Sequence, residues 1–145
     1  MALLIASLLH VFEEFVYPGG FASKFKSMMS KIGKTISTTW LIITNLMFLL
    51  AVSSVLFIQN KLYIMSIVSI VFLNACLHIG KSIHAKGYFP GLFTALFLYI
   101  PIYILGIIYT HLNFSQVMIC LSVGALLHSF PFLILWYLNP GSKRR

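Results

Sequence analysis

The sequence predicts an all-α fold: a polytopic membrane helix bundle of about five transmembrane helices plus one interfacial amphipathic helix. Of the 145 residues, 60% are hydrophobic and 8% are charged, whereas about a quarter of a soluble domain is charged. The apolar residues form continuous runs rather than alternating ones, which indicates spanning helices and not a barrel. Because these runs use most of the chain, we expect residues 1–145 to form a single transmembrane domain.

Five apolar runs are candidates for transmembrane helices, which need roughly 17 to 25 residues to cross the hydrocarbon core. The short polar stretches at 59–61 and 111–113 predict tight turns, so the helices that flank each stretch form antiparallel hairpins. The first run is the shortest, and it alone holds carboxylate side chains. The runs are 1–17, 39–58, 62–79, 92–110 and 114–138.

The segment 21–37 is predicted to be an amphipathic helix in the cytoplasmic membrane interface. Apolar residues recur every three or four positions from Phe21 to Ile36, and lysines lie between them. This pattern favours a helix whose apolar face lies in lipid and whose lysines lie near anionic head groups. The alternative interpretation is an ordinary connecting loop.

The basic residues predict the orientation, because lysines and arginines stay on the cytoplasmic side of the membrane. Nine of the ten follow the first, third or fifth run, and only Lys61 lies on the opposite side. We therefore expect a multi-pass protein of the cell membrane with its N-terminus outside and its C-terminus in the cytoplasm. The net charge of +8 then faces the negative inner leaflet. The expected partner is the lipid bilayer, and no nucleic-acid motif is present.

Glu13 and Glu14 are the only carboxylate side chains in the sequence, and both lie inside an apolar run. An ionisable side chain in the membrane costs roughly 2.5 to 3.5 kcal/mol on insertion scales, so it normally faces a partner, a cavity or a metal. His10 precedes the glutamates by three and four positions, which puts all three side chains on one broad face of a helix. The alternative is that Glu14 reaches water or pairs with Lys24, which leaves His10 unexplained.

Three polar residues in other runs lie at a compatible depth. Asn74 and His78 are four positions apart on the third run, and His128 lies on the fifth. Imidazole nitrogens together with carboxylate oxygens favour Zn or Fe. The alternative is that the histidines are hydrogen-bonded core residues and that Asn74 and His78 only bridge helices. The candidate ligands of a divalent metal are His10, Glu13, Glu14, His78 and His128.

Three motifs resemble those of the HXXEE family of integral membrane proteins. Residues 10–14 read His-Val-Phe-Glu-Glu, residues 74–78 read Asn-Ala-Cys-Leu-His, and residues 88–91 read Tyr-Phe-Pro-Gly. They are similar, in the same order, to the H-x-x-E-E, N-x-x-x-H and Y-x-P-G motifs of that family. The resemblance covers nearly the whole chain and implies a multi-helix protein of the bacterial inner membrane with a metal-binding catalytic site. It also implies supporting roles for Asn74 and Tyr88.

A metal-dependent membrane enzyme is the function that we expect. His10, His78 and one glutamate would hold the metal, with His128 as an additional ligand, and the other glutamate would be the general base. Glu13 and Glu14 are therefore both candidate catalytic residues. Hydrolysis of a lipid-soluble amide or ester is compatible with this arrangement, so the expected substrate is a lipophilic small molecule.

Two other classes of function stay open at this point. Intramembrane carboxylates with histidines also serve small proton- or cation-coupled transporters. Five helices make a small carrier, so a transporter of this size is expected to be a homodimer. The third class is a structural or regulatory membrane subunit, in which the polar cluster only locks helices together.

Overall fold

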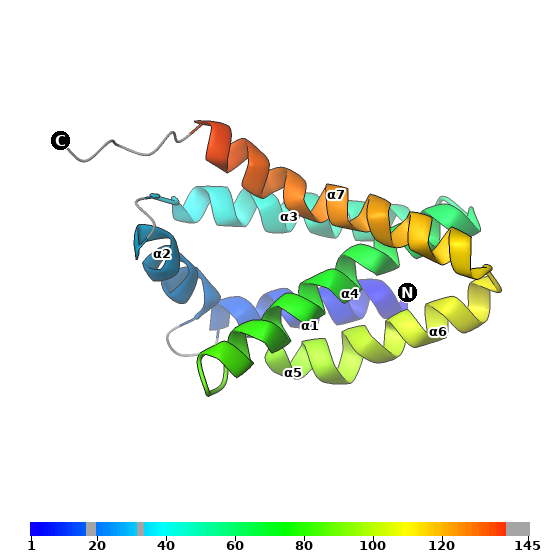
Figure 1. The fold of residues 1–145 in the computed structure, drawn as a ribbon, viewed down its shortest axis with the longest axis horizontal. Helices are drawn as coiled ribbons and strands as arrows, with labels where there is room; N and C mark the ends of the chain where they lie inside the picture. Colours follow the sequence, from blue (N-terminus) through cyan, green and yellow to red (C-terminus); the bar gives the residue numbers. More distant parts are fainter. Residues whose placement is uncertain (17–19, 32–33, 139–145) are drawn as a thin grey trace.

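The computed structural model describes residues 1–16, 20–31 and 34–138, and every regular element in this part of the chain is helical (Figure 1). The segments α5, η1 and α6 follow one another without a break, so they form one helical stretch. The predicted all-α fold class is confirmed. The elements are α1 (Ala2–Val16), α2 (Phe21–Lys31), α3 (Thr38–Ser54), α4 (Lys61–His84), α5 (Leu92–Thr94), the π-helical segment η1 (Ala95–Tyr99), α6 (Ile100–Thr110) and α7 (Phe114–Leu138).

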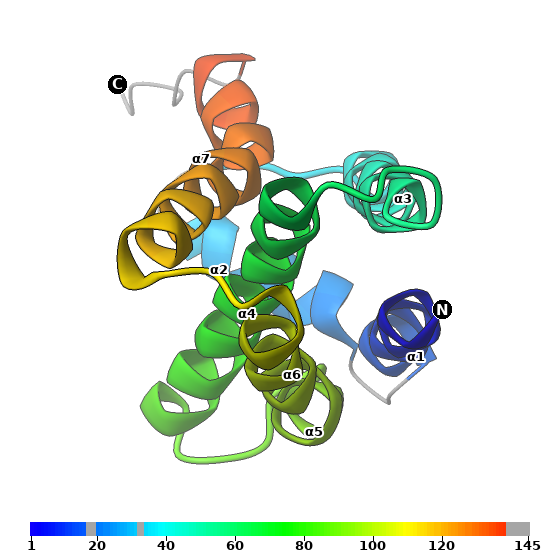
Figure 2. The same ribbon diagram turned by 90° about the vertical axis from the view of Figure 1, so that its right-hand side faces the viewer.

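Helix α4 is the centre of the bundle. It contacts α5, η1, α6 and α7, and Figure 2 shows it between α6 and α7. In the most apolar part of α4, 50% of the residues are buried, whereas in the most apolar part of α7 only 17% are buried. Helix α1 lies against α2, α3, α5 and η1. Apolar side chains from these elements form the main core cluster, which contains Ala6, Val52, Ile67, Ile70, Val71, Ala75, Ala95 and Tyr99.

The packing of α7 on α4 depends on a residue without a side chain. A Cβ atom at Gly124 of α7 would lie 2.8 Å from the Cβ atom of Ser69 and 3.1 Å from the backbone nitrogen of Ile70. The two backbones therefore approach as closely as glycine permits. Close approach of this kind gives helices van der Waals contact where lipid removes the hydrophobic driving force.

Polar caps set the two hairpin turns at the predicted positions. Asn60 caps α4, because its side-chain oxygen accepts a hydrogen bond from the Tyr63 N–H at 3.0 Å. Asn113 and Gln116 cap α7 reciprocally, each side-chain oxygen accepting from the other residue's N–H, at 2.9 and 3.1 Å. These bonds satisfy N–H groups that a helix start leaves without a partner. In Figure 1, α3 and α4 run antiparallel, as do α6 and α7.

Three helical segments of the described chain are long and apolar enough to cross a membrane: Lys61–His84, Leu92–Thr110 and Phe114–Ile134. Helix α3 has 17 residues and α1 has 15. Helix α1 passes the same test only together with α2, as a pair bent by 68°. The chain is therefore consistent with a membrane protein. The number of five crossings and the single-domain organisation stay predictions.

Two predicted boundaries of the long apolar helices were wrong. Helix α3 ends at Ser54 rather than at Ile58, because the N–H groups of residues 55–57 bond to carbonyls three positions back and form a turn. Helix α4 continues to His84 rather than ending at Ile79. Its last turn carries basic side chains, which interact favourably with the negative end of the helix dipole.

Helix α2 packs part of its apolar face against protein, and contact of the rest of that face with lipid stays a prediction. Phe25 is 4% exposed and packs with Ile36 and Leu41. Its ring centroid lies 5.9 Å from that of Phe132 on α7. The helix is also shorter than predicted, since residues 34–37 are not helical. The alternative of an ordinary loop is wrong, because Phe21–Lys31 is helix.

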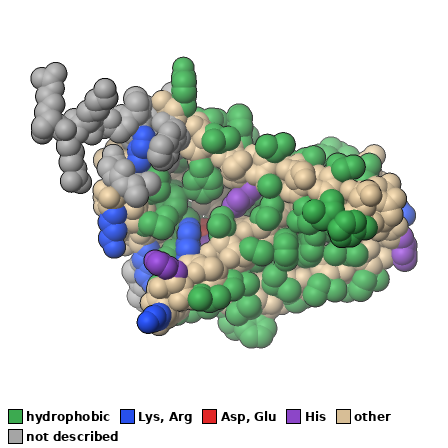
Figure 3. Space-filling view, viewed as in Figure 1, with side chains coloured by type: hydrophobic (Ala, Val, Ile, Leu, Met, Phe, Trp, Pro, Cys, Tyr) green, Lys and Arg blue, Asp and Glu red, His purple; other side chains and the backbone are tan. Residues whose placement is uncertain are grey.

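Basic side chains gather at the end of the molecule that carries α2 (Figure 3). The lysines of α2 and of the C-terminal end of α4 belong to this end, whereas Lys61 begins α4 at the other end. This separation agrees with the charge distribution from which the orientation was predicted. The basic tail 143–145 lies outside the described residues, and the orientation stays a prediction.

Candidate metal centre

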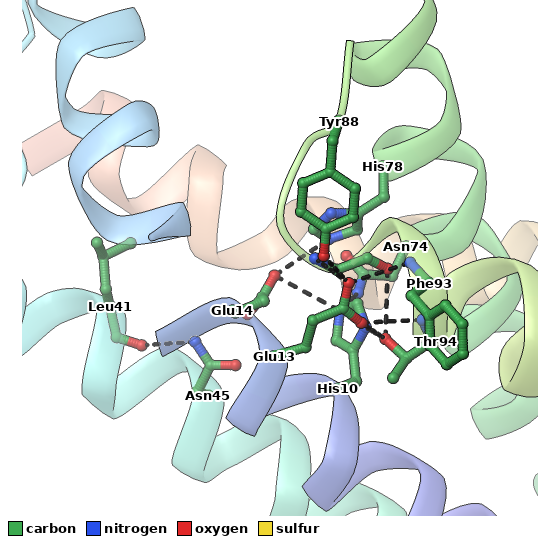
Figure 4. A network of polar contacts seen from close by, with 11 residues as sticks. His10, Glu13, Glu14, Leu41, Asn45, Asn74, His78, Tyr88, Phe93 and Thr94 are labelled. Carbon is green, nitrogen blue, oxygen red and sulfur yellow. Dashed lines mark hydrogen bonds and ion pairs between the residues drawn. The ribbon is translucent and has the colours of Figure 1, made fainter. Parts of the chain in front are cut away.

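The candidate metal centre consists of His10, Glu14 and His78, which lie together in the interior (Figure 4). Glu14 follows His10 by about one turn on α1, and His78 comes from α4. The Oε1 atom of Glu14 lies 3.5 Å from Nε2 of His10 and 3.0 Å from Nε2 of His78. The three ligand atoms lie within 4.8 Å of one another, so a single ion could contact all three.

The burial and the donor atoms of this cluster suit a metal ion. The exposed fractions are 1% for His10, 4% for Glu14 and 1% for His78. A buried carboxylate is costly unless it is paired or coordinates a cation. Two imidazole nitrogens and one carboxylate oxygen form a donor set that Zn and non-haem Fe accept. Three protein ligands leave a coordination position for a reactant, which is typical of catalytic rather than structural sites.

Hydrogen bonds fix the imidazole ring of His10. The Thr94 hydroxyl donates to Oε2 of Glu13 at 2.6 Å, so its oxygen accepts the hydrogen bond from Nδ1–H of His10 at 2.6 Å. Nε2 of His10 then carries the lone pair and accepts a hydrogen bond from the Nδ2–H group of Asn74 at 2.8 Å. A polar group behind a ligating histidine orients the ring and raises its basicity. An ion bound at Nε2 would therefore replace the hydrogen bond from Asn74.

Glu13 turns away from the cluster and caps a helix. Its Oε1 accepts hydrogen bonds from the Tyr88 hydroxyl and from the backbone N–H groups of Gly91 and Phe93, the latter two at 3.0 Å. Its Oε2 accepts from the backbone N–H of Thr94 at 2.9 Å and from its hydroxyl at 2.6 Å. A carboxylate is stabilised at a helix start by the unpaired N–H groups and by the helix dipole.

Metal binding or base catalysis by Glu13 stays a prediction, and the hydrogen bonds of its carboxylate disfavour both roles. Its two oxygens already accept five hydrogen bonds, whereas a carboxylate offers about four lone-pair sites. Glu14 is therefore the glutamate that remains available to an ion. The two side chains diverge because neighbouring residues on an α-helix with 3.6 residues per turn point about 100° apart.

The turn before α5 packs directly against both imidazole rings. Gly91 has a φ angle of +92°. A Cβ atom at this position would lie 2.6 Å from Nδ1 of His78 and 2.8 Å from Cε1 of His10. Glycine is thus required by the left-handed backbone and again by the lack of space. The motif 88–91 closes one side of the centre, with Tyr88 bonded to Glu13 and Gly91 against the histidines.

The π-helical segment η1 places an aromatic ring beside the centre. The ring centroid of Tyr99 lies 4.6 Å from that of His10, and Tyr99 is fully buried. A single π-helical turn is frequent at functional sites, where the additional residue changes the direction of the side chains that follow. In this chain the Tyr99 ring of η1 packs against the ring of His10.

The cluster forms part of the wall of a mostly apolar cavity of about 290 Å³. Elements α1, α2, α3, α4 and α7 contribute to the lining, and Asn45 faces the cavity from α3. On the face drawn in Figure 3, acidic and histidine side chains are visible in a hollow between apolar ones. The apolar lining includes Phe21, Phe25, Trp40, Leu41, Met47, Phe48, Ile70, Leu127, Phe130 and Phe132.

His128 lines the same cavity from α7 but is not a member of the three-residue cluster. Its Nε2 has no hydrogen-bond partner among the described residues, and its ring centroid lies 6.0 Å from that of Phe132. The structure therefore joins His10 to His78 directly and places His128 elsewhere on the cavity wall. His128 as an additional ligand stays a prediction.

Sequence reasoning missed Thr94 and assigned no contact to Gly91. Thr94 is one polar residue within an apolar run, and no local pattern links it to His10. Gly91 follows a proline, which is a turn signal, but its contact with both histidines depends on how the turn meets α1 and α4. Both roles arise from tertiary contacts between segments far apart in the sequence.

A family model described as "Protein of unknown function with HXXEE motif" matches residues 1–106. The matched range contains the three members of the cluster and the residues that hold them, whereas His128 lies beyond it. Comparison with curated proteins and with solved structures found no match.

Proposed function

The chain belongs to the family of proteins of unknown function with the HXXEE motif, and from this premise we propose that it is a metal-dependent membrane enzyme. One observation carries the proposal: a buried His10, Glu14 and His78 cluster lies at the wall of an apolar cavity. These three residues hold the ion, with Zn and Fe as the metals that the donor set favours.

The substrate is a lipophilic small molecule with a polar reactive group. Ligand cavities are typically apolar with a few polar groups that fix orientation, and this cavity has that character near the cluster. A lipid-soluble amide or ester has the required combination of apolar body and polar bond. When bound, the metal supplies Lewis-acid polarisation of the carbonyl group that is attacked.

The residues around the ion have distinct roles. Glu13 is a positioning residue, because it acts on His10 through the Thr94 hydroxyl. Asn74 donates to Nε2 of the same ring, the atom that binds the ion, so the ion displaces this hydrogen bond. The Nε2 atom of His128, which has no partner among the residues that the structure describes, is available to form a hydrogen bond with the substrate or to exchange a proton with it. Because Glu13 caps a helix, we assign to His128 the general-base role that we first expected of the second glutamate.

The proposal is tested by measuring the metal content of the full chain, purified in mild detergent without chelator. We expect close to one Zn or Fe ion per chain by mass spectrometry. His10→Ala, Glu14→Gln and His78→Ala each remove a ligand, so metal content is expected to fall at least about tenfold. Thermal unfolding of each variant shows whether the fold survives the substitution.

His84→Ala is the matched control, since His84 is an exposed histidine of the same helix as His78 and is outside the cluster. It is expected to keep the metal content of the wild type. A wild-type protein that is empty and stays empty after incubation with Zn or Fe would contradict the metalloenzyme proposal and favour the proton-coupled carrier. Metal retained by all three ligand variants would place the ion elsewhere.

A further inference from the structure

A second cavity lies on the outside of the bundle, between α2 and the C-terminal part of α4. It is a groove of about 590 Å³. Four basic side chains line it, and no acidic side chain is among the described residues of its wall. Of the two glutamates of the chain, Glu14 belongs to the interior cluster and Glu13 caps the start of α5. The basic lining residues are Lys24, Lys31, Lys81 and His84.

Lys81 is held at the groove by aromatic rings. Its ammonium nitrogen lies 5.0 Å from the ring centroid of Phe25, 5.2 Å from that of Phe21 and 5.3 Å from that of Phe89. Cation–π contacts of this length position the charge and leave its N–H groups able to donate to a ligand. Lys24 adds a second charge beside one of these rings, with its nitrogen 5.5 Å from the centroid of Phe89.

The remaining lining is partly apolar, which limits the class of ligand. Met28, Leu77 and Phe89 contribute apolar surface next to the lysines. The groove also lies at the end of a helix that is long and apolar enough to cross a membrane. A ligand that matches both properties has an anionic group attached to an apolar body.

We infer that this groove binds the phosphate-bearing head group of an anionic membrane phospholipid. The lysines and His84 contact the phosphate, and the acyl chains lie along the apolar side of α4. A soluble phosphate has no apolar part that could contact the apolar side chains of the groove. In a zwitterionic head group, the positive charge offsets most of the attraction between the phosphate and the lysines. The inference is independent of the proposed metal centre, because no metal ligand lines the groove.

The inference is tested by titrating the full chain in detergent with phosphatidylglycerol and counting bound lipids by native mass spectrometry. We expect binding of phosphatidylglycerol at least about tenfold tighter than that of phosphatidylcholine, because each lysine near an anionic lipid contributes about fivefold in affinity. The double variant Lys24→Gln/Lys81→Gln is expected to lose this preference by about tenfold or more on the same scale.

Two further variants separate charge in the groove from charge in general and from folding. Lys61→Gln/Lys86→Gln removes the same charge at positions that do not line the groove, and it is expected to keep the preference. Lys24→Arg/Lys81→Arg keeps the charge and is expected to bind as the wild type does. Unchanged binding by Lys24→Gln/Lys81→Gln overturns the inference. So does equal binding of phosphatidylcholine, or displacement of phosphatidylglycerol by an equal concentration of inorganic phosphate.

Discussion

Single residues decide whether the interior site can exist, and Gly91 shows this most directly. Its backbone lies against His78 and His10 in a conformation that side chains disfavour. The position therefore works as a spacer between the turn and the two rings. Any added atom there competes for the space in which the histidines meet Glu14.

Gly91→Ala is expected to lower the free energy of unfolding by about 2 to 5 kcal/mol, from the left-handed backbone and the overpacking together. It is also expected to reduce bound metal, because both rings must move. Thermal unfolding and metal analysis of the variant measure the two effects.

Gly80→Ala is the matched control for that substitution. A Cβ atom at Gly80 meets nothing within 4 Å, and alanine has the better helix propensity. We expect this variant to be as stable as the wild type or slightly more stable. Equal behaviour of the two alanine variants would show that Gly91 does not act as a spacer.

At the scale of elements, Glu13 joins α1 to the helical stretch that starts with α5. The acceptor comes from the last turn of α1, and the donors come from the first turn of that stretch and from the preceding Tyr88. The carboxylate thereby satisfies N–H groups that a helix start leaves unpaired. It also orients Thr94, whose hydroxyl bonds His10. The two glutamates thus separate into a residue that stabilises a helix start and a member of the candidate metal centre.

Glu13→Gln is expected to cost about 2 to 3 kcal/mol of stability, since an amide loses the charge and brings N–H donors to a site that already holds donors. The same substitution at Glu14 is expected to remove metal binding with a smaller loss of stability. Thermal unfolding and metal content, measured for both variants, give the comparison. A Glu13→Gln protein that is fully stable but free of metal would reverse the assignment of the two residues.

At the scale of the whole molecule, charge and apolar surface divide the bundle into two ends. Helix α4 has 24 residues and is therefore about 36 Å long at 1.5 Å per residue, enough to cross the hydrocarbon core. Lys61 begins it, and Lys81 with the lysines of α2 belongs to its other end. This division places the phospholipid groove on the predicted cytoplasmic side.

The predicted orientation is tested with single cysteines in a Cys76→Ala/Cys120→Ala background. A membrane-impermeant thiol reagent applied to intact cells is expected to label Lys61→Cys, because the turn before α4 faces outward. Lys86→Cys is expected to react only after the cells are permeabilised, because lysine-rich ends stay cytoplasmic. Labelling of both cysteines from the same side would contradict the predicted topology.

Local properties of the sequence determined the helical architecture, the hairpin turns and the neighbourhood of the site. Long uncharged runs form helices in any packing, and Asn60 or Asn113 caps the helix that follows it. The presence of carboxylates and a histidine in one apolar run was enough to indicate an interior polar cluster. The resemblance to the HXXEE family, carried by the motifs, was likewise available from the sequence and is confirmed.

Only the tertiary structure decided which of these polar residues meet. Glu13 and Glu14 are equivalent in the sequence, and the turn at 88–94 engages one while α4 presents His78 to the other. His128 has a suitable depth, yet α7 brings it to the cavity wall and not to the three-residue cluster. The physical reason is that contacts depend on the rotation and close packing of helices far apart in the sequence. A pattern along a single helix does not encode that rotation.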